Sequence, residues 1–214
     1  MLTTSQPQSN AAAGVHASIP FQSRLKVWII GGGPSLRGFD FYKLRNKTVI
    51  AVNESFLSIP WAHAVVSIDR LWIDQRIKAL NKFAGIKYLA ARKGVDLPRI
   101  DGLSYRLTLR TEPGLSEQRP VVHGRTSGYA ALNLATLLGY RQINLLGFDH
   151  TAPGQHHHAA YAWPSGAPPD LWQQLADDYS TCVPQLAQLG VEVINYGTTS
   201  AINAFTKKEL TCLQ

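Results

Sequence analysis

The stretch from Gly124 to His150 (GRTSGYAALNLATLLGYRQINLLGFDH) constrains the fold more than any other part of the chain. It joins a small, basic turn to a segment whose Ala and Leu residues recur at spacings of three and four, and then to an apolar run over 143–147. This spacing predicts a buried helix that stops at Gly139, where a left-handed residue closes a helix, followed by a short buried strand. Ligands bind at the carboxyl ends of strands in open α/β sheets, so Asp149 and His150 become candidate site residues.

The first turn of this helix is expected to bind a phosphate group. Its unpaired backbone N–H groups and the positive end of the helix dipole favour an anion, and Arg125 adds a fixed positive charge beside it. The candidate phosphate-binding residues are Arg125, Thr126, Ser127 and Gly128.

The rest of the chain repeats the order strand, turn, helix, which predicts an α/β fold with a mainly parallel sheet. A length of 214 residues fits one domain with a full core. Strands are expected over 25–30, 48–52, 64–68, 88–90 and 191–195. Helices are expected over 71–84 and 170–189, the second kinked or divided at Pro184, and helical turns over 39–44 and 200–205. The weakly patterned, basic segment 91–122 is expected to form an inserted hairpin or flap over the site.

Two further strand ends carry candidate ligand-binding residues. A glycine-rich turn follows the first strand, and glycines there allow tight turning and close approach of a ligand to the backbone. The turn has neither the spacing of the dinucleotide fingerprint nor that of a Walker loop, so a plain tight turn stays open as an alternative. Asn53 follows the second strand, where it binds a base or ribose or merely closes a turn. The residues of the glycine-rich turn are Gly31, Gly32, Gly33, Pro34 and Ser35.

The segments outside this pattern suggest a cytoplasmic protein with a mobile tail and a lid. Residues 1–22 contain no Lys or Arg and no continuous apolar segment, so we expect a disordered tail rather than a secretory signal. No apolar run approaches the length of a membrane span. Residues 151–169 form a loop long enough to be a lid. Cys182 and Cys212 form no motif, and we expect two reduced thiols, with one disulfide as the alternative.

The net charge of +7 is unevenly distributed along the chain. Residues 22–110 contain 16 basic and 6 acidic residues, whereas residues 111–214 contain 5 basic and 8 acidic residues. A positive surface on the first half suits a phosphorylated substrate, an anionic polymer or nucleic acid. A solvated basic face with no partner is the alternative.

Three blocks together resemble one superfamily. They are IIGGGPSL at 29–36, the segment 126–150 that begins TSG and ends GFDH, and the segment 195–205 that begins NYG. The pattern, which covers residues 25–205, resembles the small bacterial sialyltransferases that use CMP-sialic acid. It also resembles the motility-associated glycosyltransferases and the archaeal hydroxymethylpterin pyrophosphokinase. The resemblance implies a single Rossmann-like domain with a lid over 151–169, within a nucleotide-sugar-binding domain spanning 23–214.

The resemblance also implies roles for individual residues. Gly31, Gly33, Pro34 and Ser35 match the glycine turn, Asn53 matches an Asn that contacts the nucleotide, and residues 125–128 match an Arg-x-Ser-Gly segment. An Asp-His pair in many relatives corresponds to Asp149 and His150. A later His and Tyr of the lid fall in the region of His156, His157, His158 and Tyr161, with Trp163 as a second aromatic candidate. The loop lengths differ from those of the sialyltransferases, so the resemblance extends to the nucleotide site and not to sialic acid.

These residues favour a glycosyltransferase that moves a sugar from a CMP- or UDP-type donor to a hydroxyl acceptor. A neutral His suits the role of general base. His157 and His158 are the first candidates for this role, and His150 is the next. Arg125 and the first-turn amides would steady the departing phosphate. A solvated loop or adventitious metal binding is the alternative for the three successive histidines. A zinc site formed by these histidines with Asp149 and His150 is a further alternative.

Several alternatives stay open from the sequence. The Asp-x-Asp motif of many metal-dependent glycosyltransferases is absent, so we expect transfer without a required cofactor. A diphosphokinase of the pterin type would instead use Mg²⁺ held by Asp69 or Asp149. A third reading is a non-catalytic nucleotide- or nucleic-acid-binding module, with strongly salt-dependent binding. A polyanionic acceptor such as modified DNA, and a homo-oligomer, remain open as well.

Overall fold

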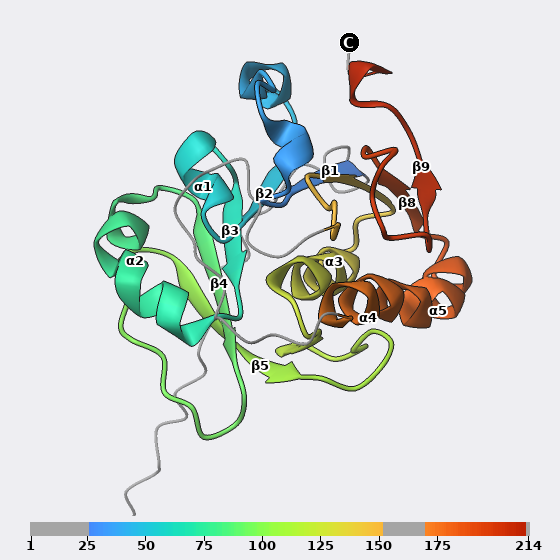
Figure 1. The fold of residues 1–214 in the computed structure, drawn as a ribbon. Coiled ribbons are helices and arrows are strands. Elements are labelled where there is room, and N and C mark those ends of the chain that lie inside the picture. Colours follow the sequence, from blue (N-terminus) through green and yellow to red (C-terminus); the bar gives the residue numbers. More distant parts are fainter. Residues whose placement is uncertain (1–25, 152–169, 213–214) are drawn as a thin grey trace, which may run out of the picture.

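The computed structural model describes residues 26–151 and 170–212. They form one nine-stranded sheet in the order β6-β5-β4-β3-β2-β1-β7-β8-β9, and each neighbouring pair is parallel (Figure 1). The predicted α/β fold with a parallel sheet in a single Rossmann-like domain is confirmed. The predicted tail over 1–22 and nearly all of the predicted lid lie outside the described residues.

The central strands are nearly continuous runs of buried apolar residues, as expected for a parallel sheet covered on both faces. β1 pairs with β2 on one side, where Trp28 lies opposite Val49, and with β7 on the other, where Trp28 lies opposite Asn144. The strand order therefore reverses direction between β1 and β7. The strands are β1 (Lys26–Ile30), β2 (Val49–Val52), β3 (Ala64–Ser67), β4 (Ile86–Ala91), β5 (Ser104–Arg110), β6 (Val121–His123), β7 (Gln142–Leu146), β8 (Glu192–Asn195) and β9 (Thr206–Lys207).

Helices cover both faces of the sheet and enclose two hydrophobic clusters. One face carries the short helix α1 (Ser55–Ser58), α2 (Arg70–Lys82) and the 3-10 segments η2 (Pro34–Leu36) and η3 (Phe41–Leu44). The other carries α3 (Ser127–Leu137), α4 (Leu171–Asp177), η4 (Asp178–Cys182) and α5 (Val183–Gln188). A last 3-10 segment, η5, spans Leu210–Cys212.

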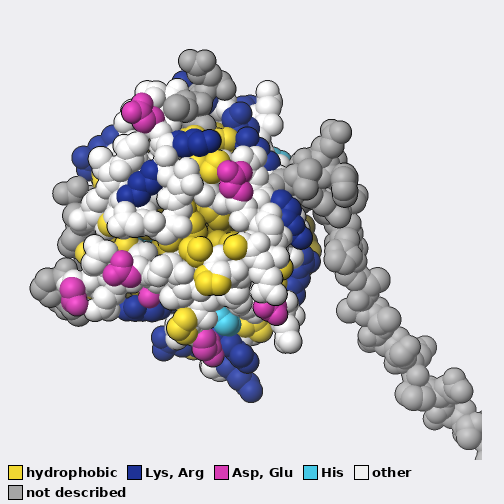
Figure 2. All heavy atoms as spheres, turned by 90° about the vertical axis from the view of Figure 1, so that its right-hand side faces the viewer, with side chains coloured by type: hydrophobic (Ala, Val, Ile, Leu, Met, Phe, Trp, Pro, Cys, Tyr) yellow, Lys and Arg dark blue, Asp and Glu magenta, His cyan; other side chains and the backbone are white. Residues whose placement is uncertain are grey.

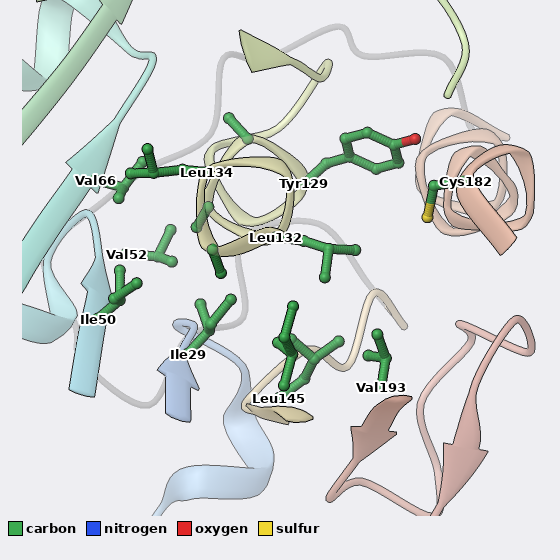
Figure 3. Packing of buried hydrophobic residues seen from close by; sticks show 14 of the residues in the cluster. Ile29, Ile50, Val52, Val66, Tyr129, Leu132, Leu134, Leu145, Cys182 and Val193 are labelled. Carbon is green, nitrogen blue, oxygen red and sulfur yellow. The ribbon is translucent and has the colours of Figure 1, made fainter. Parts of the chain in front are cut away.

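The helix α3 lies at the centre of the hydrophobic cluster on the face that also carries α4 and α5, between the sheet and the α4–α5 segment (Figure 3). Its side facing the sheet meets Ile29, Val52 and Val66, and Tyr129 points toward Cys182 on the opposite side. The helix begins where the Thr126 hydroxyl accepts the Tyr129 N–H at 3.1 Å, a standard N-cap. It ends just before Gly139, which has φ +91°. The predicted helix and its stop are confirmed.

Two predictions about local structure are wrong. The segment 91–122 forms no inserted hairpin, because it contains β5 and β6, which extend the sheet in parallel from β4. These strands lie near one edge and lack the apolar run of a central strand, and β5 carries two exposed arginines, Arg106 and Arg110. Residues 200–205 form no helical turn. The Ser200 hydroxyl accepts the Ile202 N–H and donates to the Phe148 carbonyl, and the chain then enters β9.

The predicted helix over 170–189 is divided, as expected. The chain passes from α4 through η4 into α5, with Pro184 in the first turn of α5, where its missing N–H costs no hydrogen bond.

Figure 2 shows the side of the molecule that lies to the right in Figure 1, where basic and acidic side chains surround a hydrophobic patch. Within 26–151 and 170–212, no helix has both the length and the apolar character needed to cross a bilayer.

Candidate functional site

A cavity of about 610 Å³ lies along the carboxyl edge of the sheet. Residues that follow β1, β2, β3, β4, β5 and β7 line it, together with the first turn of α3. It therefore includes the switch point between β1 and β7, where ligands bind in open α/β sheets. The sequence-predicted residues that line it are Gly31, Gly32, Gly33, Pro34, Asn53, Asp69, Arg125, Thr126, Ser127, Gly128, Asp149 and His150.

The remaining predicted residues do not line the cavity or lie outside the described part of the chain. Ser35 does not line the cavity but donates its N–H to Asp149 Oδ2 at 3.0 Å. The lid candidates fall outside the described residues, so their roles stay predictions; they are His156, His157, His158, Tyr161 and Trp163. Cys182 is a free, buried thiol, and burial raises its pKa to about 11.

The glycine turn is held against the loop that follows β7. The Gly33 N–H donates to the Gly147 carbonyl at 2.8 Å, next to the bond between Ser35 and Asp149. A Cβ on Gly33 would overlap Asp149 Oδ2, so the glycine is required by this close approach. Asp149 is 4% exposed, and its Oδ1 has no hydrogen-bond partner within the described ranges. One oxygen of this carboxylate thus anchors the turn, and the other is buried without a partner in those ranges.

Two strained residues flank the glycine turn. Asn53 (φ +48°) and His150 (φ +50°) are the positive-φ residues other than glycine in the described part of the chain, and both line the cavity. Each has a buried side-chain atom without a hydrogen-bond partner there, Asn53 Oδ1 and His150 Nδ1. Backbone strain and unpaired buried polar atoms are both uncommon and both concentrate at functional sites. Their coincidence at one cavity makes it the candidate functional site.

The start of α3 is fixed by its own side chains, which leaves its backbone for a ligand. The Ser127 hydroxyl accepts the Ile68 N–H at 3.1 Å and so ties α3 to the end of β3. The Ser127 and Gly128 N–H groups, in the first turn, have no recorded partner among residues 26–151 and 170–212. A Cβ on Gly128 would lie 2.7 Å from Phe148 and 3.0 Å from the Tyr179 hydroxyl, which explains the Ser-Gly start. The first turn of α3 therefore keeps two N–H groups free among the described residues, whereas the Ser127 hydroxyl is engaged, and its role in binding a phosphate stays a prediction.

Arg125 stands beside this turn with its charge only partly neutralised. Its guanidinium lies 3.4 Å from an Asp178 carboxylate oxygen, a long contact between side chains that are 38% and 31% exposed. Exposed pairs of this kind contribute at most about 1 kcal/mol, so Arg125 can exchange Asp178 for a phosphate at little cost.

A buried polar cluster that sequence reasoning missed supports the opposite wall. Glu54 is 4% exposed, accepts the Trp72 Nε1–H at 2.9 Å and forms a bidentate pair with Arg76. The neighbouring Ser55 hydroxyl donates to the Gly31 carbonyl at 2.6 Å and ties this wall to the glycine turn. Glu54 and Arg76 are 22 positions apart, so only their position next to a strand end could have drawn attention to them.

Part of the cavity lining is apolar. Val52, Ile68, Val95, Leu109 and Phe148 contribute to it, together with arginines, the first turn of α3 and the glycine turn. A cavity whose lining combines cations and N–H groups with apolar side chains suits a ligand that joins an anionic group to a flat or apolar body.

Asp69 and Asp149 do not form a shared metal site. Asp69 caps α2 by accepting the Trp72 N–H at 3.0 Å. Asp69 follows β3, whereas Asp149 follows β7. These two strands are three strand spacings apart in the sheet, a distance of about 14 Å. Within the described residues, no three His, Cys, Asp or Glu side chains are grouped so that they could hold a metal ion.

His150 is held in a neutral state by its surroundings. Its ring packs edge-on against Tyr179 at 5.5 Å and Trp172 at 6.2 Å. Burial lowers the pKa of His150 to about 4, and burial also raises the pKa of the Tyr179 hydroxyl. At neutral pH the imidazole, which lines the cavity, is uncharged and can donate and accept hydrogen bonds there, and the buried phenol behind it stays protonated.

Comparison with known proteins adds no family to this description. No protein-family model matches the chain, and no significant match was found among curated proteins or among solved structures.

Proposed function

We propose that the protein is a glycosyltransferase that moves a sugar from a nucleotide-activated donor to a hydroxyl acceptor. The observation that carries the proposal is the cavity at the switch point, in which the open first turn of α3 and Arg125 face the same space as the glycine turn and Asn53. Helix N-termini at this place in α/β sheets favour phosphate groups. The choice of glycosyl transfer among nucleotide-dependent reactions rests on the resemblance of the three sequence blocks to glycosyltransferases.

Each part of the cavity has a role in this reaction. The Ser127 and Gly128 N–H groups and Arg125 bind the donor phosphate and stabilise the charge that develops on it when the sugar departs. Asn53 and the glycine turn hold the nucleoside, and the apolar lining excludes water from the reacting bond. The general base remains assigned to His157 or His158 by sequence alone. His150, neutral and partly exposed to the cavity, orients the acceptor by hydrogen bonding.

The charges of the cavity favour transfer without a divalent cation. The Asp69 and Asp149 carboxylates follow strands three positions apart in the sheet and are each engaged in a backbone hydrogen bond. Arg92 and Arg125 line the same space and supply positive charge directly, and Arg70, which is paired with Asp74 at 2.9 Å, lines it too.

A thermal-shift screen tests the proposal and names the nucleotide. The ligands are CMP, UDP, GDP, ADP and ATP, each with Mg²⁺ and with EDTA, because a ligand that binds only the native state raises the melting temperature. A CMP or UDP shift that persists in EDTA, followed by release of that nucleotide from its sugar conjugate, supports the proposal. An ATP shift that requires Mg²⁺ supports the diphosphokinase alternative, and no shift with any nucleotide rejects both.

A paired substitution locates the phosphate. Arg125→Gln should weaken binding of the nucleotide by about 10- to 100-fold, the equivalent of about 1.5–3 kcal/mol for a charged hydrogen bond, and leave binding of the matching nucleoside unchanged. Arg110→Gln is the matched control, because Arg110 is an exposed arginine at the end of β5 that does not line the cavity. Equal losses in both variants, measured by calorimetry, would show that only the overall charge of the protein matters.

A further inference from the structure

We propose that the amino edge of the sheet, opposite the cavity, is a docking surface for single-stranded nucleic acid. We call it the basic aromatic surface, and it consists of Lys26, Tyr42, Lys43, Arg45, Lys47 and Trp61. Most of it comes from the segment that precedes β2, part of the blue region at the top of Figure 1. The proposal concerns a different edge of the sheet and does not depend on the proposed transferase activity.

The positive charges of this surface are brought together by the sheet. Lys26 begins β1, and Lys47 lies two residues before Val49, which pairs with Trp28. The two lysines are therefore neighbours in register, and their amines lie 5.5 Å and 5.7 Å from the centre of the Trp28 ring. Lys43 and Arg45 add two more cations, and residues 41–47 contain no acidic residue. Such a density of cations neutralises several phosphates at once.

An exposed aromatic stack lies within the same surface. The Tyr42 ring packs on Trp61 with centroids 5.0 Å apart, and the Arg45 guanidinium lies over Trp61 at 4.8 Å. Tyr42 is nevertheless 69% exposed, more than any other large hydrophobic side chain in the described residues. A tyrosine fixed from one side and open on the other is a platform on which a base can stack.

The combination of features selects the partner. Cations alone would attract any polyanion, but an exposed ring between them adds affinity only for a polyanion that carries flat bases. Unpaired bases are accessible for stacking in single strands and not in a duplex. The five residues of β1 separate this surface from the cavity by about 17 Å, so a strand bound here leaves the cavity open.

Fluorescence anisotropy with fluorescein-labelled (dT)20 tests the proposal over a series of KCl concentrations. The charge variant combines Lys43→Gln, Arg45→Gln and Lys47→Gln, and it should reduce the slope of log affinity against log salt by about 2, at about 0.7 per lost phosphate contact. The matched control is Lys78→Gln with Lys82→Gln, two exposed lysines on α2, and it should change the affinity by less than about threefold.

A second variant isolates the stacking contribution. Tyr42→Ala should weaken (dT)20 binding by about fivefold or more, whereas Tyr42→Phe should retain it, because stacking needs the ring and not the hydroxyl. Inorganic polyphosphate, which has no bases, serves as a competitor, and its affinity should be the same for wild type and Tyr42→Ala. Tyr42 is mostly solvent-exposed, so these substitutions leave the fold intact.

Four results would overturn the proposal. The first is no binding of (dT)20 by the wild type at 50 mM KCl, and the second is equal losses in the charge variant and the α2 control. The third is an equal effect of Tyr42→Ala on (dT)20 and on polyphosphate. The fourth is binding to phosphatidylserine vesicles without binding to (dT)20, which would assign the surface to membranes instead.

Discussion

Acidification should destabilise the protein through His150, and replacing this histidine should remove part of that loss. Burial places the pKa of His150 at about 4 in the folded state, whereas an unfolded histidine has a pKa near 6.5. Between these values the unfolded chain binds the proton and the folded protein does not, so stability falls as the pH drops through this range. At pH 5 the pH lies about 1.5 units below the unfolded pKa, which lowers the free energy of unfolding by about 2 kcal/mol, and this loss grows further toward pH 4.

Urea denaturation at pH 7.5 and pH 5.0 measures this effect in the wild type and in His150→Asn. Asparagine is chosen because it tolerates the positive φ of this position. Burial also lowers the pKa of His63, but that residue is present in both proteins, so its contribution cancels in the comparison. The wild type should lose about 2 kcal/mol more than the variant between the two pH values. Identical losses would refute the idea that His150 is held neutral by burial.

Three further predictions follow from single contacts. Ser127→Ala removes the hydroxyl that accepts a partly buried backbone N–H and should lower the free energy of unfolding by about 0.5–1.5 kcal/mol in urea, with nucleotide affinity nearly unchanged. Glu54→Ala leaves Arg76 without its buried partner and should cost about 3 kcal/mol in the same assay, and a loss below 1 kcal/mol would contradict this. In a Cys212→Ser background, Cys182 should resist a thiol reagent at pH 8 until urea unfolds the protein.

The parts of the fold that the sequence could predict are those governed by local chemistry. The start and end of α3 follow from a threonine cap at Thr126 and a left-handed glycine at Gly139. The central strands are buried on both faces, so each appears in the sequence as a continuous apolar run. Because parallel strands end at the same edge, the sequence alone predicts that the residues following them lie together, and they line one cavity.

The parts that could not be predicted depend on tertiary position. β5 and β6 lie toward the edge of the sheet, and solvent on one side replaces the apolar run that identifies a central strand. The bond between Glu54 and Arg76 joins positions on two different elements and leaves no periodic signal. The backbone strain at Asn53 and His150 also leaves no signal in the sequence. The turns after β2 and β7 impose the positive φ there, and neither asparagine nor histidine by itself requires it.

This strain and the unpaired atoms around the cavity imply a direct link between ligand binding and stability. Asn53 Oδ1, Asp149 Oδ1 and His150 Nδ1 are buried without hydrogen-bond partners in the described ranges, and an unsatisfied buried polar atom costs about 1–3 kcal/mol. In the free protein, the burial of the two large hydrophobic clusters on the sheet offsets this destabilisation. A ligand whose N–H or O–H groups meet these atoms removes the penalty as it binds. The nucleotide that fits should therefore raise the melting temperature more than a ligand of equal size that merely contacts the apolar lining of the cavity.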